Sequence, residues 1–152
     1  MTATAPKPLR LVLDTSVVVA GLLWSGPPRR LLEWAIEGGK LELFSSPVLL
    51  DELAHTLRYP KLTPRIQGFS SSVEELVAQY AALVSLVVPA SVPRVVKGDA
   101  DDDHVIAAAV AASAELIVTG DRRHLLPIGV HQGIAIISAR ELLDRMDAAG
   151  VR

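Results

Sequence analysis

The stretch LRLVLD, residues 9–14, decides the fold of this chain of 152 residues. Leu9 to Leu13 form a short apolar run that predicts a buried β-strand, and Asp14 follows it directly. Residues 17–23 then continue as an apolar helix. Strand–helix units of this kind predict a parallel sheet whose carboxyl ends share one edge, where ligands bind. We therefore expect Asp14 to lie at a ligand-binding edge.

The alternation of strand and helix continues to the end of the chain. Further strands are expected at residues 41–44, 84–88, 115–119 and 134–137. Helices are expected at residues 29–37, 46–59, 71–83, 104–114 and 138–147, with a short helix or loop at 61–69. Core-facing residues are expected at Leu31, Leu32, Ala35 and Ile36 in one helix and at Val48, Leu49, Leu53 and Leu57 in another. The pattern predicts an α/β protein with a mainly parallel sheet of four to five strands and helices on both faces.

Composition limits the class of protein. Half of the residues are hydrophobic and the mean hydropathy is +0.36, yet no apolar run reaches the roughly 18 residues of a membrane span. We expect one domain at residues 9–149 behind a flexible tail at 1–8 that does not resemble a signal peptide, and so a cytoplasmic protein. The lack of cysteine excludes disulfides, thiolate metal sites and cysteine nucleophiles. The net charge of −2 provides no overall basic field for nucleic acid.

Acidic residues recur where the expected strands end or the helices begin. Asp121 follows the strand at 115–119, the run 98–103 contains four aspartates, and Glu52 lies in the helix after residues 41–44. Since the carboxyl ends of parallel strands meet at one edge, these acids are expected to converge with Asp14. Carboxylates gathered without basic partners repel, and a hard divalent cation such as Mg²⁺ or Mn²⁺ removes that cost. The pattern predicts a metal site suited to phosphodiester chemistry.

Each acid also has a purely structural explanation. Asp14 is a good helix N-cap residue, the helix dipole favours aspartates near a helix N-terminus, and Gly120-Asp121 is an ordinary turn. Glu52 in mid-helix would simply face solvent. Taken alone, each acid is better explained by structure, and only the convergence of all of them on one edge favours a functional interpretation.

Signatures of other chemistries are missing from the sequence. It contains no GxSxG elbow, no Walker phosphate loop and no GxGxxG, so nucleotide cofactor binding through such motifs is unsupported. The four histidines show no paired-ligand spacing, and only His104 is expected near the acids.

Four short motifs, in the family's order, resemble those of the PIN-domain nucleases. They are LDTSV at residues 13–17, SSP through DEL at 45–53, DADDDHVIAA at 99–108 and VTGD at 118–121. Ser16 stands where the family usually has Asn, and the acid of the second block falls on Glu52. The match covers roughly residues 9–145, and the subgroup most similar is that of the PIN-family ribonuclease toxins of bacterial toxin–antitoxin systems.

The resemblance implies a three-layer α/β/α sandwich with Mg²⁺- or Mn²⁺-dependent endoribonuclease activity, in a homodimer that a cognate antitoxin protein holds inactive. The third motif favours Asp102 as its metal ligand, with Asp99 and Asp103 as alternates. The catalytic residues implied are Asp14, Glu52, Asp102 and Asp121, and all of these except Glu52 are implied metal ligands. Glu52 would bind a second metal or orient the attacking water. The side chains expected to support the carboxylates are Thr15, Ser16 and Thr119.

Substrate and partner contacts are less specific. The basic residues expected to touch the RNA backbone are Arg29, Arg30, Arg58, Lys61, Arg122 and Arg123. Taken singly, each of them is better explained as part of a solubilising surface. Helix 17–23 and the face containing Leu31, Leu32, Ala35 and Ile36 are candidate surfaces for a second copy or an antitoxin, and ordinary core packing is the alternative for both.

Two rival functions use a similar fold. A phosphotransfer receiver domain needs an acid pair after its first strand and a late lysine, but Asp14 stands alone and no lysine follows Lys97. A haloacid-dehalogenase-like phosphatase needs an aspartate two residues after its nucleophile, where this chain has Ser16. A non-catalytic binding module with the same fold is the second rival, and only a measurement of turnover separates it from an enzyme.

Overall fold

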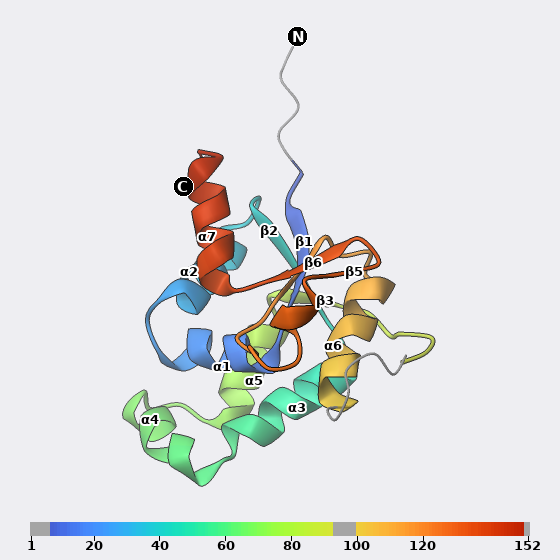
Figure 1. Ribbon diagram of the computed structural model, residues 1–152. Helices are drawn as coiled ribbons and strands as arrows, with labels where there is room; N and C mark the ends of the chain where they lie inside the picture. The colour runs from blue at the N-terminus through green and yellow to red at the C-terminus, as the bar shows by residue number, and fades with distance from the viewer. Residues whose placement is uncertain (1–6, 93–99, 151–152) are drawn as a thin grey trace.

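A six-stranded sheet forms the centre of the molecule in the computed structural model, which describes residues 7–92 and 100–150 (Figure 1). The strands are β1 (Leu9–Leu13), β2 (Leu41–Ser45), β3 (Val84–Leu86), β4 (Leu116–Val118), β5 (Val130–His131) and β6 (Ile134–Ile137). Their order in the sheet is β3-β2-β1-β4-β6-β5. All neighbours are parallel except β5, which pairs antiparallel with β6 at the edge. The mainly parallel sheet is confirmed, and β5 is one strand more than the sequence predicted.

Helices connect the strands, as the sequence pattern predicted. They are α1 (Thr15–Leu23), α2 (Pro27–Glu37), α3 (Pro47–Leu57), α4 (Thr63–Gly68), α5 (Val73–Ala81), α6 (Ala100–Ala111) and α7 (Ala139–Ala148), with short 3₁₀ turns at Pro60–Leu62 and Leu126–Ile128. Three of them begin at a serine N-cap: the hydroxyls of Ser46, Ser72 and Ser138 each accept a hydrogen bond from the amide three residues later. These caps satisfy amides that the first helical turn leaves without a partner.

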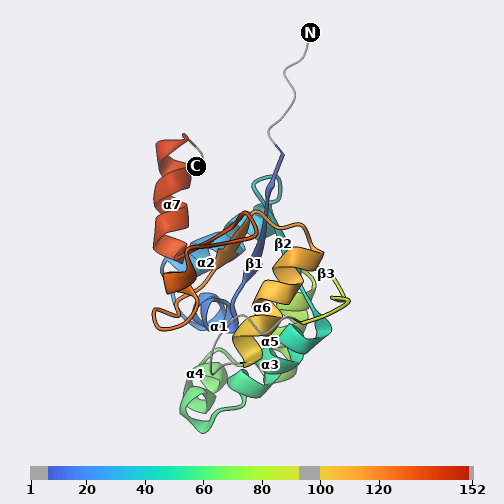
Figure 2. The same cartoon turned by 45° about the vertical axis from the view of Figure 1, so that its right-hand side comes forward.

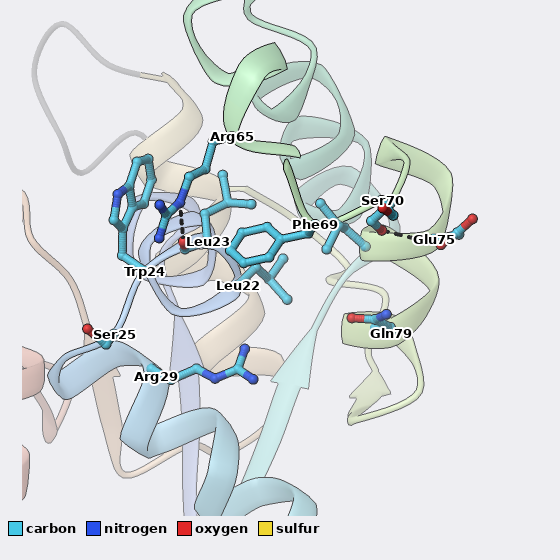
Figure 3. Close-up of a pocket in the computed structure, with 12 residues that line it drawn as sticks. Leu22, Leu23, Trp24, Ser25, Arg29, Arg65, Phe69, Ser70, Glu75 and Gln79 are labelled. Carbon is cyan, nitrogen blue, oxygen red and sulfur yellow. Dashed lines mark hydrogen bonds between the residues drawn. The ribbon is translucent and has the colours of Figure 1, made fainter. Parts of the chain in front are cut away.

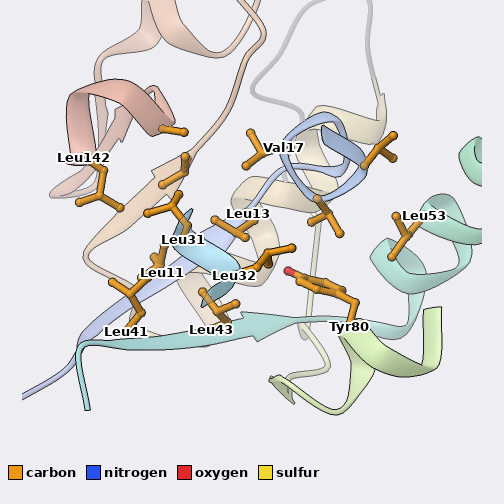
Figure 4. Packing of buried hydrophobic residues seen from close by; sticks show 14 of the residues in the cluster. Leu11, Leu13, Val17, Leu31, Leu32, Leu41, Leu43, Leu53, Tyr80 and Leu142 are labelled. Carbon is orange, nitrogen blue, oxygen red and sulfur yellow. The ribbon is translucent and has the colours of Figure 1, made fainter. Parts of the chain in front are cut away.

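Two hydrophobic cores lie on opposite faces of the sheet. Leu11 and Leu13 of β1 point to one face, where they meet residues of α1, α2, α3, α5 and α7 (Figure 4). Val12 points to the other face and packs with the buried alanines of α6. Figure 2 shows α6 lying across the sheet from α2 and α7. The three-layer α/β/α arrangement expected from the sequence is confirmed.

Two core-facing positions predicted from helical periodicity are wrong. Ile36 at the end of α2 is 66% exposed, and Val48 in the first turn of α3 is 46% exposed. In α2 the indole of Trp34 packs into the core instead. In α3 the buried stripe runs through Leu49, Leu53 and the residue four further on, Leu57. Most of helix 17–23 and the pair Leu31 and Leu32 are buried core, so they offer no partner surface.

Helix α1 is held close against α2 by the lack of a side chain at Gly21. A Cβ there would lie 2.8 Å from Cδ1 of Leu32 and 3.0 Å from the carbonyl oxygen of Pro28. Such approaches are shorter than van der Waals contact and would push the two helices apart. Gly21 therefore helps to fix α1, whose N-terminus carries Asp14.

The order of the strands creates a crevice at one end of the sheet. From β1 the chain moves outward to β2 and β3, and then returns to the other side of β1 to form β4 and β6. Ligands of open α/β sheets bind where the strand order reverses, outside the carboxyl ends of the strands. In this chain that point lies between the ends of β1 and β4. No helix in the described part of the chain combines the length and apolar character needed to cross a membrane.

Candidate active site

The ends of β1 and β4 bring Asp14 and Thr119 together. The backbone amide of Asp14 donates to the carbonyl of Val118 at 2.9 Å, which continues the strand pairing by one residue. The hydroxyl of Thr119 then donates to Oδ2 of Asp14 at 2.7 Å, across a sequence separation of 105 residues. Both side chains are buried, with exposed fractions of 0% for Thr119 and 7% for Asp14.

Asp14 occupies the N-cap position of α1, but its side chain does not accept the capping hydrogen bond that an N-cap residue usually receives from the amide two or three residues later. Its Oδ2 is instead occupied by Thr119 and lies 3.4 Å from the hydroxyl of Ser16. Helix capping therefore does not explain why a carboxylate is buried here.

Burial is costly for the charge on Asp14. Burial raises the pKa of Asp14 above its ordinary value of 3.8, and the nearby charge of Asp121 raises it further. Hydrogen bonds from Thr119, from the amide of Thr15 and from Ser16 offset part of this rise. The net direction is upward, so the carboxylate form of Asp14 would be stabilised by a positive charge in the crevice.

Asp121 stands in the turn that follows β4. Its Oδ1 accepts hydrogen bonds from the amides of Arg123 at 2.9 Å and His124 at 3.1 Å, so the turn predicted from the sequence is present. Burial works to raise the pKa of Asp121, but these two amides, a hydrogen bond with the Asp102 carboxyl and the nearby His124 outweigh it, and the pKa lies below 3.8.

Thr119 links the two carboxylates. Its Oγ1 accepts a hydrogen bond from the amide of Asp121 at 3.0 Å while its hydroxyl hydrogen is directed at Asp14. A hydroxyl has one hydrogen to donate and two acceptor positions, so one side chain serves both neighbours. The orientation of Asp14 and the start of the Asp121 turn thus depend on the same atom.

A second group of side chains lies beside this pair. Asp102, Asp121 and His124 each offer one ligand atom, and these atoms all lie within 4.8 Å of one another. Nδ1 of His124 is 3.4 Å from Oδ2 of Asp121 and 3.8 Å from Oδ2 of Asp102. Among the residues that the structure describes, no other set of three histidine, aspartate or glutamate side chains is grouped so closely.

His124 was missed by the sequence analysis, which expected only His104 near the acids. The signal that could have found it is local: His124 follows Asp121 by three residues within one turn. The hydrogen bond from the His124 amide to Asp121 closes that turn and brings the imidazole back over the carboxylate.

The donor set fits a divalent cation. Asp102 is buried and its carboxyl is close enough to Asp121 to share a hydrogen bond, an arrangement in which two negative charges would repel. Oxygen donors suit Mg²⁺ and Mn²⁺, whereas an imidazole is more usual around later transition metals. Asp102, Asp121 and His124 could together hold such an ion, with Asp14 on the neighbouring strand end.

Three other acids were named from the sequence: Asp99, Asp103 and Glu52. Asp103 is buried, with an exposed fraction of 1%. Asp99 lies outside the described residues. Glu52 is half-buried on α3, one helical turn before Thr56, which lines a pocket together with Ser16. Residues four apart share a helix face, so Glu52 lies on the side of α3 that is turned toward the start of α1.

The basic residues named from the sequence are dispersed. Arg58 pairs with Glu74 at 3.2 Å on the surface, and the guanidinium of Arg30 stacks on Trp34. Arg122 and Arg123 are exposed in the turn beside Asp121. Two others border pockets next to α1, where Arg29 lines one and Lys61 the other.

A comparison with known protein families finds a match. A family model described as the PIN domain matches residues 10–123, which include β1 with Asp14 and the turn after β4 with Asp121. PIN domains are typically nucleases, and they usually use a divalent metal ion. A search of the curated proteins finds no significant match to this chain. Since the family model covers well over half of the chain, we conclude that the protein belongs to the PIN domain family.

Proposed function

We propose that this protein is a metal-dependent endoribonuclease that hydrolyses RNA phosphodiester bonds. The observation that carries the proposal is the buried Asp14, held by Thr119 at the strand-order crevice beside the group of Asp102, Asp121 and His124. Family membership supports nuclease chemistry in general.

The proposed ion is Mg²⁺ or Mn²⁺, held by Asp14, Asp102 and Asp121. When bound, such an ion lowers the pKa of a water molecule and stabilises negative charge on the phosphate. The chain's own residues supply the rest. Thr119 and Ser16 orient the Asp14 carboxylate, while the amides of Arg123 and His124 fix the Asp121 carboxylate. Glu52 would orient the attacking water from the α3 side.

The biological setting proposed is that of a cytoplasmic toxin with a cognate antitoxin protein, acting as a homodimer. This part of the proposal rests on the similarity of the four sequence motifs to PIN-family toxins.

Metal titration and an RNA cleavage assay test the activity together. Calorimetry with Mn²⁺ and Mg²⁺ should show binding to the wild type and none to the double variant Asp14→Asn with Asp102→Asn. Cleavage of a mixed RNA pool should need the ion, stop with EDTA and be lost in Asp14→Asn. Asp51→Asn is the matched control, because Asp51 is an exposed acid beside Glu52 and should leave binding and cleavage unchanged.

Three outcomes would contradict the proposal. Cleavage that persists in Asp14→Asn would come from another nuclease in the preparation. Metal binding without cleavage of any RNA would favour the non-catalytic binding module. Acid-labile phosphorylation of Asp14 by a small phosphodonor would favour the phosphotransfer class.

A further inference from the structure

The aromatic side chains of this chain fall into two equal groups. Three are buried in the two cores: Trp34, Phe44 and Tyr80. Three are exposed on the surface, with exposed fractions of 42 to 51%: Trp24, Tyr59 and Phe69. Exposed aromatic rings cost solvation without contributing to the core, so their grouping on one surface needs an explanation.

Two of the exposed rings flank one arginine. The guanidinium carbon of Arg65 lies 5.4 Å from the centre of the Trp24 ring and 5.0 Å from that of Phe69 (Figure 3). Nε of Arg65 donates to the carbonyl of Leu23 at 2.8 Å, which holds the guanidinium in place. The three side chains line a pocket of about 470 Å³. Rings and guanidinium together form a preorganised stacking surface.

The third exposed ring extends this surface toward the acids. Tyr59 lines a second pocket, of about 480 Å³, together with Lys61, Trp24 and Ser16. Trp24 lines both pockets, so they adjoin. Ser16 is two residues from Asp14 and contacts its carboxylate. Counting about 1.5 Å per residue along α1, the surface from Ser16 to Trp24 is about 12 Å long.

We call Trp24, Tyr59, Lys61, Arg65 and Phe69 the aromatic track, and its charge is positive. Lys61 and Arg65 are exposed and form no ion pair with an acid in the part of the chain that the structure describes. Arg29 lines the pocket of about 470 Å³ with Trp24, Arg65 and Phe69, and one of its nitrogens donates to the carbonyl of Gly21. One acid, Glu75, lines the same pocket as Arg29 and Arg65, so these two cations and Lys61 leave the surface with a net positive charge, in contrast to the net charge of −2 of the whole chain.

We propose that the aromatic track binds unpaired nucleotides of an RNA chain that continues from the acidic site. The proposal rests on the function proposed above and adds a binding surface to it. Aromatic rings stack on bases of any sequence, and cations beside them hold the phosphates. A stacked strand rises about 3.4 Å per nucleotide, so the 12 Å of α1 would accommodate about three nucleotides. RNA supplies one phosphate for each base that can stack, so it matches both the rings and the cations of the track.

The test uses a labelled single-stranded 12-mer RNA in EDTA, where cleavage is stopped, with fluorescence anisotropy as the measure of binding. Trp24→Ala and Phe69→Ala should each weaken binding about tenfold, the typical effect of losing one stacked base. Trp24→Phe keeps a ring and should bind within about threefold of the wild type by the same reasoning. Ile36→Ala, which removes an exposed apolar side chain from α2, is the matched control and should change nothing.

Two further measurements locate the contact. RNA should quench the fluorescence of the wild type, because Trp24 is exposed and Trp34 is buried, and Trp24→Phe should bind RNA with most of that quenching lost. An abasic 12-mer should bind the wild type more weakly than the normal RNA binds Trp24→Ala, because it loses every stacked base and not only one. In the cleavage assay with Mn²⁺, Phe69→Ala should raise KM and leave kcat unchanged.

The outcomes separate this proposal from the one it rests on. RNA binding that depends on the track, in a protein that cleaves nothing, would overturn the nuclease function and keep the track. Cleavage and binding that are unaffected by Trp24→Ala and Phe69→Ala would overturn the track and keep the nuclease. A wild type that binds no RNA would overturn the track. The track would also be overturned if light scattering showed a wild-type dimer that dissociates in Trp24→Ala and Phe69→Ala, because the rings would then form a protein interface.

Discussion

Two carboxylates at neighbouring strand ends show how differently one fold treats the same side chain. Asp14 after β1 is buried, which raises its pKa, and the hydroxyls of Thr119 and Ser16 at its Oδ2 offset only part of that rise. Asp121 after β4 is more exposed, and its Oδ1 receives two backbone amides, so its pKa is lowered. The partial positive charges of the two backbone amides stabilise the carboxylate of Asp121. The buried carboxylate of Asp14 has no such pair of amides among the described residues, and a cation from outside the chain would stabilise it.

Asp14 and Asp121 therefore have different tasks on the two sides of the crevice. Groups whose pKa is displaced by burial and by neighbouring charge mark functional sites, whereas turn-forming carboxylates are common in any protein. Asp14 is thus the acid that structure alone explains least. Asp121 is both a turn-forming carboxylate and a candidate site residue. Its Oδ1 accepts the hydrogen bonds of the turn, and its Oδ2 faces His124 and Asp102.

The largest expected effect is on cleavage in Asp14→Asn. Removing the charge while keeping the shape should lower kcat/KM at least about a hundredfold, since metal-assisted charge stabilisation contributes several kcal/mol. Asp121→Asn should cost less, because the amide oxygen of asparagine can still accept from Arg123 and His124. Rates measured side by side at saturating Mn²⁺ check this, and equal losses in both variants would contradict the division of tasks.

The next largest effect is expected from Thr119→Val, which removes the one hydroxyl that serves both carboxylates. Loss of such a supporting hydrogen bond typically lowers metal affinity or activity by about 10–100-fold. Valine has nearly the same shape, so packing is kept while Asp14 and the amide of Asp121 lose a partner. Thr119→Ser retains the hydroxyl and should keep most of the activity. The measurement is the Mn²⁺ affinity from calorimetry. An unchanged affinity in Thr119→Val would mean that the two strand ends act independently.

A smaller effect is expected from His124→Ala. The change removes the imidazole but leaves the amide that donates to Asp121, so the turn itself should survive. Mn²⁺ affinity should fall by about tenfold, the low end for residues around a metal, while Mg²⁺ affinity should change less because magnesium prefers oxygen donors. Equal losses for the two ions would show that His124 acts by holding Asp121 rather than by contacting the ion.

Strand ends and helix starts could be predicted from the sequence because their signals are local. The apolar run before Asp14 and the Ser46-Pro47 helix start each depend on a few neighbouring residues, and both are present in the structure. The convergence of Asp14 and Asp121 could be predicted for a different reason, because the carboxyl ends of parallel strands meet at one edge of the sheet.

Features that depend on distant partners could not be predicted in this way. Val48 lies in the first turn of α3 and is 46% exposed, although its hydropathy suits the core. The two-residue strand β5 is an exception, because its partner β6 follows directly across the turn Gln132-Gly133, and β5 was missed because so short a strand gives little signal. His124 reaches Asp102 through the tertiary placement of α6, about 20 positions away in the chain, which spacing alone does not reveal. The link from Thr119 to Asp14 has the same origin, because the hydroxyl reaches the carboxylate only once β4 pairs with β1.

The smallest expected effect concerns stability without metal, where the two acids should act with opposite signs. In EDTA at neutral pH, Asp14→Asn should stabilise the protein, by about 1.4 kcal/mol for each unit by which folding raises the pKa of Asp14. Asp121→Ala should destabilise it by about 1 kcal/mol, because two amides lose their acceptor. Urea unfolding of the three proteins measures both differences.

The pH dependence of these differences tests their cause. Folding raises the pKa of Asp14, so the wild type carries no penalty below 3.8 and loses stability relative to Asp14→Asn as the pH rises through the folded value. Folding lowers the pKa of Asp121, so its contribution is present above 3.8 and is lost as the pH falls below it. Added Mn²⁺ should remove the advantage of Asp14→Asn, because binding to the folded wild type offsets the cost of the buried charge. An advantage that is independent of both pH and Mn²⁺ would show that packing, not charge, separates the two strand ends.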